Sequence, residues 1–313
     1  KRPFMAEKPR QLSALSPPGG APQMPLGAPR TAEDEEFEEA DALLADLRCR
    51  AEAGDSDLPW GHCVDRSWDE EGALVVTREF VPSARPGAPR LRIRELPFSA
   101  HPTSGVGCTG GVVWPGAVAL VDLLQGPRGA ELLEAPCRRV VELGAGCGLA
   151  GLTAAALLED EASSVLLTDC SAPVLENLRR IVAANADVLR PRVEVAHLAW
   201  EELLDGTAGA LPGCTGGVDL LLGSDVIWGG RGSLVARVAL QLVRPGGKLA
   251  VSSEVGREGL DAFEALLQGG GPSPQDCGPG AALPRPRFDV EVVPMRVDGR
   301  SEDFVVYVGC RRE

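Results

Sequence analysis

The stretch Val140-Val-Glu-Leu-Gly-Ala-Gly-Cys-Gly148 decides the fold of this chain. An apolar run typical of a buried strand leads into three alternating glycines, and a helical pattern begins at Leu149. Glycine in such a turn lets the backbone approach a ligand closely, and the helix N-terminus points at whatever binds there. The stretch therefore predicts a nucleotide-type binding loop that follows a parallel strand.

Two carboxylates near this loop indicate what kind of ligand it binds. The glycines alone also fit NAD or FAD, because Gly146-Cys-Gly-Leu-Ala-Gly151 matches the dinucleotide pattern G-x-G-x-x-G. Glu142 would repel a pyrophosphate but suits a cationic group, such as the amino acid end of S-adenosylmethionine. Asp169 ends the next predicted strand, where a carboxylate accepts hydrogen bonds from ribose hydroxyls. NAD and S-adenosylmethionine both carry such hydroxyls, so Glu142 is the residue that favours S-adenosylmethionine over a dinucleotide.

From about residue 101, strand-like and helical patterns alternate along the chain. Strands are predicted at 140–143, 165–169, 193–198, 218–224 and 248–254, and helices near 114–124, 149–158, 173–185, 234–243 and 259–267. This alternation is typical of an α/β fold, a parallel sheet covered by helices on both faces. Two last runs, 288–293 and 304–309, predict an antiparallel hairpin at the end of the sheet.

The chain divides into three predicted parts. Residues 1–30 hold seven prolines and little apolar content, so we expect a disordered tail, with an organelle transit peptide as the alternative interpretation. Residues 31–100 are expected to form an extension of the α/β domain. In it, a helix begins at a capping box at Thr31, and the runs 73–80 and 91–96 form a β-hairpin. Residues 101–313 predict the α/β domain.

The composition bears on partners and on metal binding. The chain of 313 residues carries 31 basic and 45 acidic residues, a net charge of −14 that argues against a nucleic-acid surface and permits a basic protein partner. Nine cysteines form no C-x-x-C pair, and with three histidines they offer no metal-ligand cluster, so we expect buried free thiols.

The apolar stretch 140–158 contains Glu142 and several glycines, which fits a strand and helix better than a membrane span. We further expect a monomer in the cytoplasm or the nucleus.

Three more segments carry a resemblance to a known family. They are Thr109-Gly-Gly-Val-Val-Trp-Pro-Gly-Ala117, Val195-Ala-His-Leu-Ala-Trp200-Glu-Glu and Leu222-Gly-Ser-Asp225-Val-Ile-Trp228. With the glycine loop, they resemble methyltransferase family sixteen of the class I S-adenosylmethionine-dependent methyltransferases, whose members are mostly protein-lysine methyltransferases. The resemblance implies a seven-stranded Rossmann-like sheet, mostly parallel, with a C-terminal antiparallel hairpin.

The resemblance also assigns site residues. It implies that the cofactor is bound by Trp114, Glu142, Gly144, Ala145, Gly146, Gly148, Asp169, Trp200 and Ser224, and that Asp225 and Trp228 orient the substrate. Trp228 stands where the family has tyrosine or a related aromatic residue, and Glu201 stands where it has glycine. Alternative interpretations are a core tryptophan for Trp114 and a cap on the following loop for Asp225.

The expected activity is methyl transfer from S-adenosylmethionine to a lysine of a non-histone protein. Three alternatives stay open: a small-molecule substrate, a protein histidine or arginine, and a non-catalytic S-adenosylmethionine-binding module. The stretch Ser224–Ile227 differs from the Asn/Asp-Pro-Pro-aromatic tetrad typical of amino-group methylation on bases, which argues further against a nucleic-acid substrate.

Overall fold

The computed structural model describes residues 57–58, 61–68, 74–82, 89–96, 109–134, 136–270, 287–297 and 303–312. All of them belong to one compact unit that spans Thr31–Glu313. The predicted tail at 1–30, the predicted helix after Thr31 and the Gly/Pro-rich loop at 271–286 lie outside the described residues.

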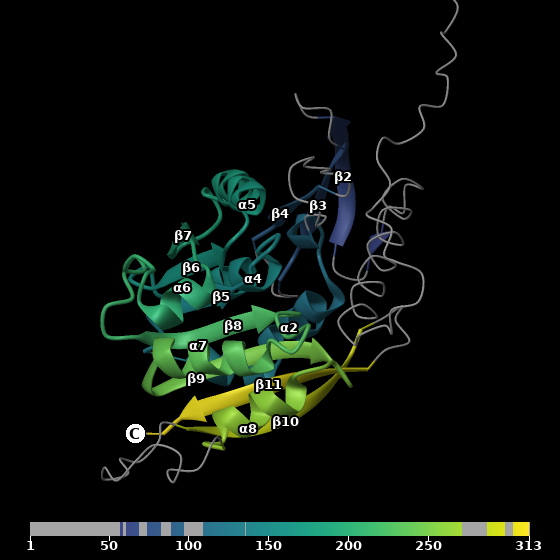
Figure 1. Cartoon of the computed structure of the whole chain (residues 1–313). Helices are drawn as coiled ribbons and strands as arrows, with labels where there is room; N and C mark the ends of the chain where they lie inside the picture. Colours follow the sequence, from purple (N-terminus) through teal and green to yellow (C-terminus); the bar gives the residue numbers. More distant parts are fainter. Residues whose placement is uncertain are drawn as a thin grey trace, which may run out of the picture. The chain divides into compact units, whose positions relative to one another are not determined.

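A seven-stranded sheet forms the centre of the fold, in the order β10-β11-β9-β8-β5-β6-β7 (Figure 1). Its strands are β5 (Arg139–Leu143), β6 (Ser164–Asp169), β7 (Arg192–His197), β8 (Val218–Ser224), β9 (Val243–Glu254), β10 (Phe288–Arg296) and β11 (Asp303–Arg311). Strands β5 to β9 pair in parallel, whereas β11 runs antiparallel to both of its neighbours, β9 and β10. The predicted Rossmann-like sheet with its C-terminal antiparallel hairpin is therefore confirmed.

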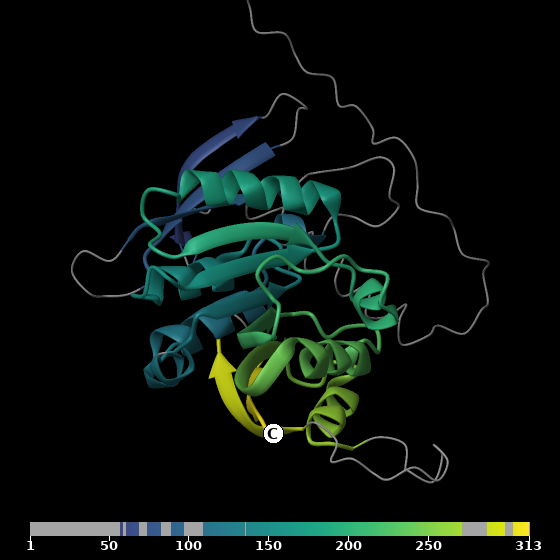
Figure 2. The ribbon, with the colours of Figure 1, turned by 90° about the vertical axis from the view of Figure 1, so that its left-hand side faces the viewer.

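Helices cover both faces of this sheet (Figures 1 and 2). One apolar cluster joins it to α2 (Pro115–Gln125), α4 (Leu149–Leu157) and α5 (Ala172–Ala184), and a second joins it to α6 (Trp200–Asp205), α7 (Gly232–Leu242) and α8 (Leu260–Leu267). Alternate strand residues supply the two clusters, because successive side chains point to opposite faces: Val140 belongs to the first and Val141 to the second. None of the described helices has the length and apolar character needed to span a membrane.

Most of the predicted elements are confirmed to within a few residues. The six-residue helices α3 (Pro127–Leu132) and α6 were not predicted, because a helix of fewer than two turns shows too little periodicity. The start of β9 at Val243 was also missed, since Pro245-Gly-Gly247 interrupts the apolar pattern.

The order of the strands fixes where a ligand can bind. From β5 the chain moves outward to β6 and β7, and it then returns to place β8 on the other side of β5. The carboxyl ends of β5 and β8 therefore flank the point at which the strand order reverses. Open α/β sheets bind their ligands in the crevice at this point.

A second, antiparallel sheet precedes the main one, in the order β1 (Asp57–Leu58), β2 (Gly61–Trp68), β3 (Leu74–Phe80) and β4 (Leu91–Glu95). The pair β3 and β4 confirms the predicted hairpin. Strand β2 was not predicted, because it shows no alternation of apolar and polar residues and is exposed over most of its length.

Two buried asparagines of α5 join this N-terminal sheet to the main fold. The side-chain amide of Asn185 accepts a hydrogen bond from Arg92 N at 2.8 Å and donates one to Arg92 O at 2.8 Å. Earlier in α5, Asn177 Nδ2 donates to Arg94 O at 2.9 Å, whereas Asn185 is the C-cap of the helix. The amides thus satisfy backbone groups of β4 much as a neighbouring strand would.

The expected free thiols are described at six positions, with a mixed outcome for burial. Cys137 and Cys147 are buried, and burial raises the pKa of the Cys137 thiol to about 12. Cys170 and Cys310 are exposed, so the expectation of buried thiols is wrong for these two. Cys170 directly follows β6 and Cys310 is the last residue but one of β11, so both lie at or near strand ends.

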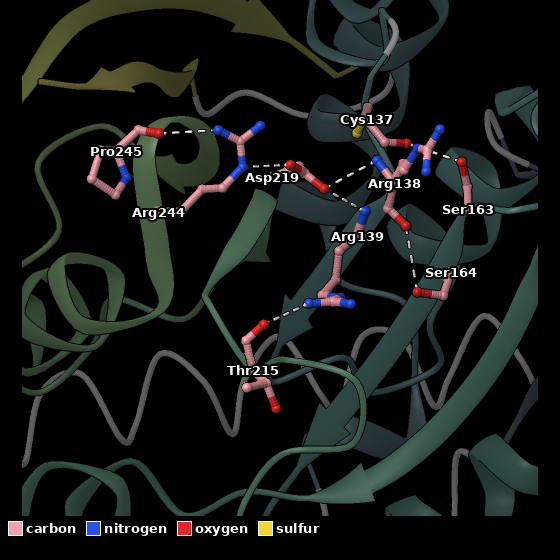
Figure 3. Close-up of polar contacts among 9 residues, drawn as sticks. All are labelled: Cys137, Arg138, Arg139, Ser163, Ser164, Thr215, Asp219, Arg244 and Pro245. Carbon is pink, nitrogen blue, oxygen red and sulfur yellow. Dashed lines mark hydrogen bonds and ion pairs between the residues drawn. The ribbon is translucent and has the colours of Figure 1, made fainter. Parts of the chain in front are cut away.

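Asp219 organises the edge of the main sheet opposite the predicted site (Figure 3). Its Oδ2 accepts hydrogen bonds from Arg138 N at 3.0 Å and Arg139 N at 2.7 Å, and its Oδ1 accepts one from Arg244 Nε at 2.6 Å. One carboxylate at the start of β8 therefore fixes the start of β5 and the first residues of β9.

We expect Asp219→Ala to lower the free energy of unfolding by about 1–3 kcal/mol, since it removes the acceptor of three donors. Urea denaturation measures this loss. Asp160→Ala is the matched control: its exposed carboxylate accepts a local bond from Ala162 N, and its removal should cost about 0.5 kcal/mol or less. Equal losses in the two variants would contradict the organising role of Asp219.

Candidate functional site

The predicted glycine loop connects β5 to α4 through a left-handed backbone. The φ angles are 54° at Gly144, 53° at Gly146 and 72° at Gly148, a region that residues with a Cβ rarely adopt. Between them, Ala145 N donates to Thr168 O at 2.8 Å, which ties the loop to the end of β6. The loop therefore lies at the reversal point of the sheet with its backbone open to close approach.

Glu142 lies buried directly beneath this loop. Its side chain points at α4, where Oε2 accepts a hydrogen bond from Gly151 N at 2.9 Å, and Oε1 has no hydrogen-bond partner among the described residues. Burial and, to a smaller extent, the nearby Asp169 raise the pKa of the Glu142 carboxyl from near 4.5 to about 8, although the bond from Gly151 opposes the rise. A buried carboxylate oxygen without a partner suits a cationic ligand group, so the residue fits the amino acid end of S-adenosylmethionine.

Asp169 ends β6 beside the loop, as predicted. Its Oδ2 accepts a bond from Gly146 N at 3.3 Å and its Oδ1 one from Ser171 N at 2.9 Å. Burial raises the pKa of the Asp169 carboxyl, although these backbone amides oppose the rise. Each carboxylate oxygen has two lone pairs, so the bonds leave capacity for ribose hydroxyls.

The segment 109–116, here the Trp114 segment, lies directly against the glycine loop. A Cβ on Gly110 would come within 3.3 Å of Gly146 Cα, so the two backbones touch. Trp114 is half-buried and donates from Nε1 to Thr109 O at 2.8 Å, which folds its ring over its own segment. The partly exposed ring fits a pocket wall better than the alternative of a core tryptophan.

Trp200 forms a second aromatic wall. It begins α6, and a Cβ on Gly144 would lie 3.7 Å from its Cζ2 and 2.9 Å from Val226 Cγ1. Gly144 is therefore enclosed between an aromatic and an aliphatic side chain. Ser224 ends β8 next to them and is half-buried. The structure thus brings Trp200 and Ser224 to the loop, as the predicted cofactor site requires.

Asp225 has a strained backbone and a long-range partner. Its φ of 51° is positive, and among the described residues no other non-glycine shares this feature. Strain of this kind concentrates at functional sites. Its Oδ2 accepts a bond from Gly116 N at 2.6 Å, in the first turn of α2. Asp225 therefore caps the first turn of α2, a partner that neither interpretation of this residue predicted.

Trp228 already has a cation on its ring. The guanidinium carbon of Arg231 lies 4.8 Å from the ring centroid, and Arg231 Nη1 also pairs with Glu201 Oε1 at 3.2 Å. Arg231 precedes α7 and Glu201 lies in α6, so the ion pair links the loop after β8 to α6. Trp228, which is expected to orient the substrate, is thus able to hold a cation.

Several residues that build the site were not predicted from the sequence. Ser252 of β9 donates from Oγ to Gly116 O at 2.7 Å, and Gly116 has no room for a Cβ beside Asp225. Val113 N donates to Glu95 Oε1 at 3.0 Å. The polar Ser252-Ser253 in an apolar strand was a usable signal for Ser252, whereas nothing local marks Glu95.

We predict that Glu142→Gln removes a pH-dependent cost to stability. The folded protein keeps the Glu142 proton up to about pH 8, whereas the unfolded chain releases it near pH 4.5. The contribution of this group to the free energy of unfolding is therefore fully present below pH 4.5 and is lost as the pH rises to about 8. Without ligand, the gain of the variant over the native protein should grow by at most about 1.4 kcal/mol per pH unit and level off above pH 8. Urea titrations at several pH values measure it. Exposed Glu161→Gln is the control, and a gain that does not change with pH would contradict the prediction.

Several known methyltransferases are similar to parts of this chain. Protein N-lysine methyltransferase METTL21A of Danio rerio is 38% identical over 118 residues, which cover 37% of this chain and 47% of that protein. Protein-lysine N-methyltransferase EEF2KMT of Mus musculus is 31% identical over 132 residues, or 39% of this chain and 36% of that protein. The chain thus spans about half the length or less of these relatives. An O-methyltransferase from Bacillus cereus, solved with SAH, superposes with a TM-score of 0.42 at 18% identity, over 63% of this chain and 82% of that one.

Residues 96–253 match the model of the lysine methyltransferase family, over just more than half of the chain. The matched region contains the glycine loop, Asp169, Trp200, Asp225 and Trp228, all placed at one edge of the sheet. The expected cofactor, S-adenosylmethionine, is confirmed with it. The chain belongs to the lysine methyltransferase family.

Proposed function

We propose that this protein transfers a methyl group from S-adenosylmethionine to a lysine side chain of a non-histone protein in the cytoplasm or the nucleus. The observation that carries the proposal is the family match together with the place of its residues. The matched glycine loop, Asp169 and Asp225 all lie at the carboxyl ends of β5, β6 and β8, where the strand order reverses.

The residues around the loop would bind and orient the cofactor. Glu142 and Asp169 are two acids on neighbouring strands, and a cationic ligand group would stabilise the ionised form of each carboxyl, so the pair favours such a ligand. Trp114 and Trp200 provide apolar surface on two sides of the loop, which excludes water from the bound ligand. S-adenosylmethionine supplies an activated methyl group on a sulfonium sulfur.

Asp225 is the residue that we assign to the substrate nitrogen. A lysine ammonium has no lone pair, so it must lose a proton before it can accept a methyl group, and a nearby carboxylate assists that loss. The bond from Gly116 N fixes the carboxylate of Asp225 at the end of β8, and the strained backbone at φ 51° sets its direction. A group held in this way can orient an amine in line with the methyl group.

Trp228 would receive the cationic lysine before it reaches Asp225. Its ring already binds the guanidinium of Arg231, and the same face can attract an ammonium group through cation–π interaction. Arg231 is 39% exposed in its side chain, so it can leave the ring at little cost when a substrate arrives. The surplus of acid in the whole chain is compatible with a basic segment around the target lysine.

Labelling a proteome tests the proposed reaction. The protein is incubated with methyl-labelled S-adenosylmethionine and an extract of cells that lack it, and mass spectrometry locates the label. We expect label on lysines of one or a few proteins. Asp169→Ala should abolish the labelling and raise the dissociation constant for S-adenosylhomocysteine at least about tenfold, because it removes the ribose acceptor.

Other results would replace this proposal. Label confined to small molecules, or on histidine or arginine, would overturn the choice of lysine. No label from a protein that binds S-adenosylhomocysteine would indicate a non-catalytic binding module instead.

Substitutions of Trp228 and of Arg231 should change the rate of methylation of the labelled substrate in opposite directions. Trp228→Ala should lower the rate of methylation about tenfold or more, whereas Trp228→Tyr should retain most of it, since tyrosine also offers an aromatic face. Arg231→Ala should raise the rate or lower KM, because it removes a cation that competes for the ring. If Arg231→Ala lowers the rate as Trp228→Ala does, Arg231 supports the ring instead. The dissociation constant for S-adenosylhomocysteine should stay unchanged in all three variants.

A further inference from the structure

Glu95, the last residue of β4, makes two buried hydrogen bonds in different directions. Its Oε2 accepts from Arg78 Nε of β3 at 2.8 Å, and its Oε1 accepts from the backbone N of Val113 at 3.0 Å. Arg78 is 2% exposed and Glu95 is 4% exposed. The carboxylate therefore joins the N-terminal sheet to the backbone next to Trp114, in surroundings that exclude water.

The neighbouring residue adds a second link between the same two elements. Leu96 N donates to Gly111 O at 2.6 Å, and a Cβ on Gly111 would lie only 2.8 Å from Leu96 O. This approach of two backbones leaves no space for a side chain at position 111. The end of β4 thus fixes both Gly111 and Val113.

The Trp114 segment also has fixed contacts elsewhere. At its end, Gly116 is bonded to Asp225 and Ser252 at the carboxyl ends of β8 and β9. At its start, Gly110 touches Gly146 of the glycine loop, and Cys147 Sγ donates to Gly110 O at 3.6 Å. The segment is consequently held between the N-terminal sheet on one side and the cofactor loop on the other.

We propose that Glu95 is a positioning residue of the cofactor site: it holds the Trp114 segment against the glycine loop, so that the N-terminal sheet takes part in binding S-adenosylmethionine. Glu95 acts through Val113 and does not touch the ligand. The family match begins at residue 96, one residue after it, so the role belongs to a part of this chain outside the matched region. The proposal rests on cofactor binding at the glycine loop and is independent of which substrate is methylated.

A matched pair of double variants isolates the bond to Val113. Arg78→Leu with Glu95→Gln removes both charges but keeps a side-chain oxygen for Val113 N. Arg78→Leu with Glu95→Leu removes the charges and the acceptor alike. Changing both partners avoids leaving one buried charge unpaired. Binding of S-adenosylhomocysteine is measured by calorimetry, and Tm is recorded for each full-length protein.

We expect the Gln pair to bind within about threefold of the native protein, and the Leu pair to bind about five- to tenfold more weakly, as for one lost hydrogen bond. Asn185→Ala is the control for mere loss of stability, because Asn185 bonds β4 to α5 away from the Trp114 segment. It should lower Tm and leave the dissociation constant unchanged. Equal affinity of the two double variants would overturn the proposal.

A second variant covers the case in which the Leu pair does not fold. Gly111→Ala leaves Arg78 and Glu95 intact but forces the Trp114 segment away from Leu96 O, so it should weaken binding of S-adenosylhomocysteine to a similar extent. Native affinity in Gly111→Ala would contradict the proposal. If the native protein itself does not bind S-adenosylhomocysteine, the cofactor assignment fails first, and the two failures are thereby distinguished.

Discussion

The close packing of α4 on the ends of β5 and β6 is the constraint on which the site depends. Gly151 of α4 has no room for a Cβ between Glu142 and Leu167, so the helix begins directly against the two strands. The chain must then turn from β5 into α4 within a few residues, and the left-handed glycines make that turn possible. As a result, the first amides of α4 and the acids of two neighbouring strands converge on one point.

This arrangement lowers the stability of the ligand-free protein and favours the binding of a ligand. A carboxylate under the first turn of a helix, with one oxygen unpartnered among the described residues, is costly in the ligand-free protein, and its raised pKa reflects that cost. The strained backbone of Asp225 is a second local cost at the same edge of the sheet. By contrast, the opposite edge satisfies its donors through Asp219. The two ends of the same strands thus serve ligand binding and stability respectively.

The sequence allowed the main elements to be predicted because their signals are local. The strands from β5 to β8 are short apolar runs with clear boundaries, and the glycine loop and Asp169 follow directly from them. What could not be predicted depends on partners far apart in the chain. Asp225 and Gly116 are separated by 109 positions, and their bond exists only because the sheet places the end of β8 beside the start of α2. The same holds for Glu95, a charged residue in a hairpin strand that only the folded protein shows to be buried.

The position of β11 affects how the domain is completed during synthesis. β11 is later in the chain than β9 and β10, yet it lies between them and pairs with both along most of its length. While a ribosome is still making residues 303–311, β9 has an unpaired edge and β10 has no neighbour in the sheet. A nascent chain at this stage presents open backbone donors and acceptors to other proteins. The edge of β9 consequently stays open to aggregation until residues 303–311 have left the ribosome and paired with it.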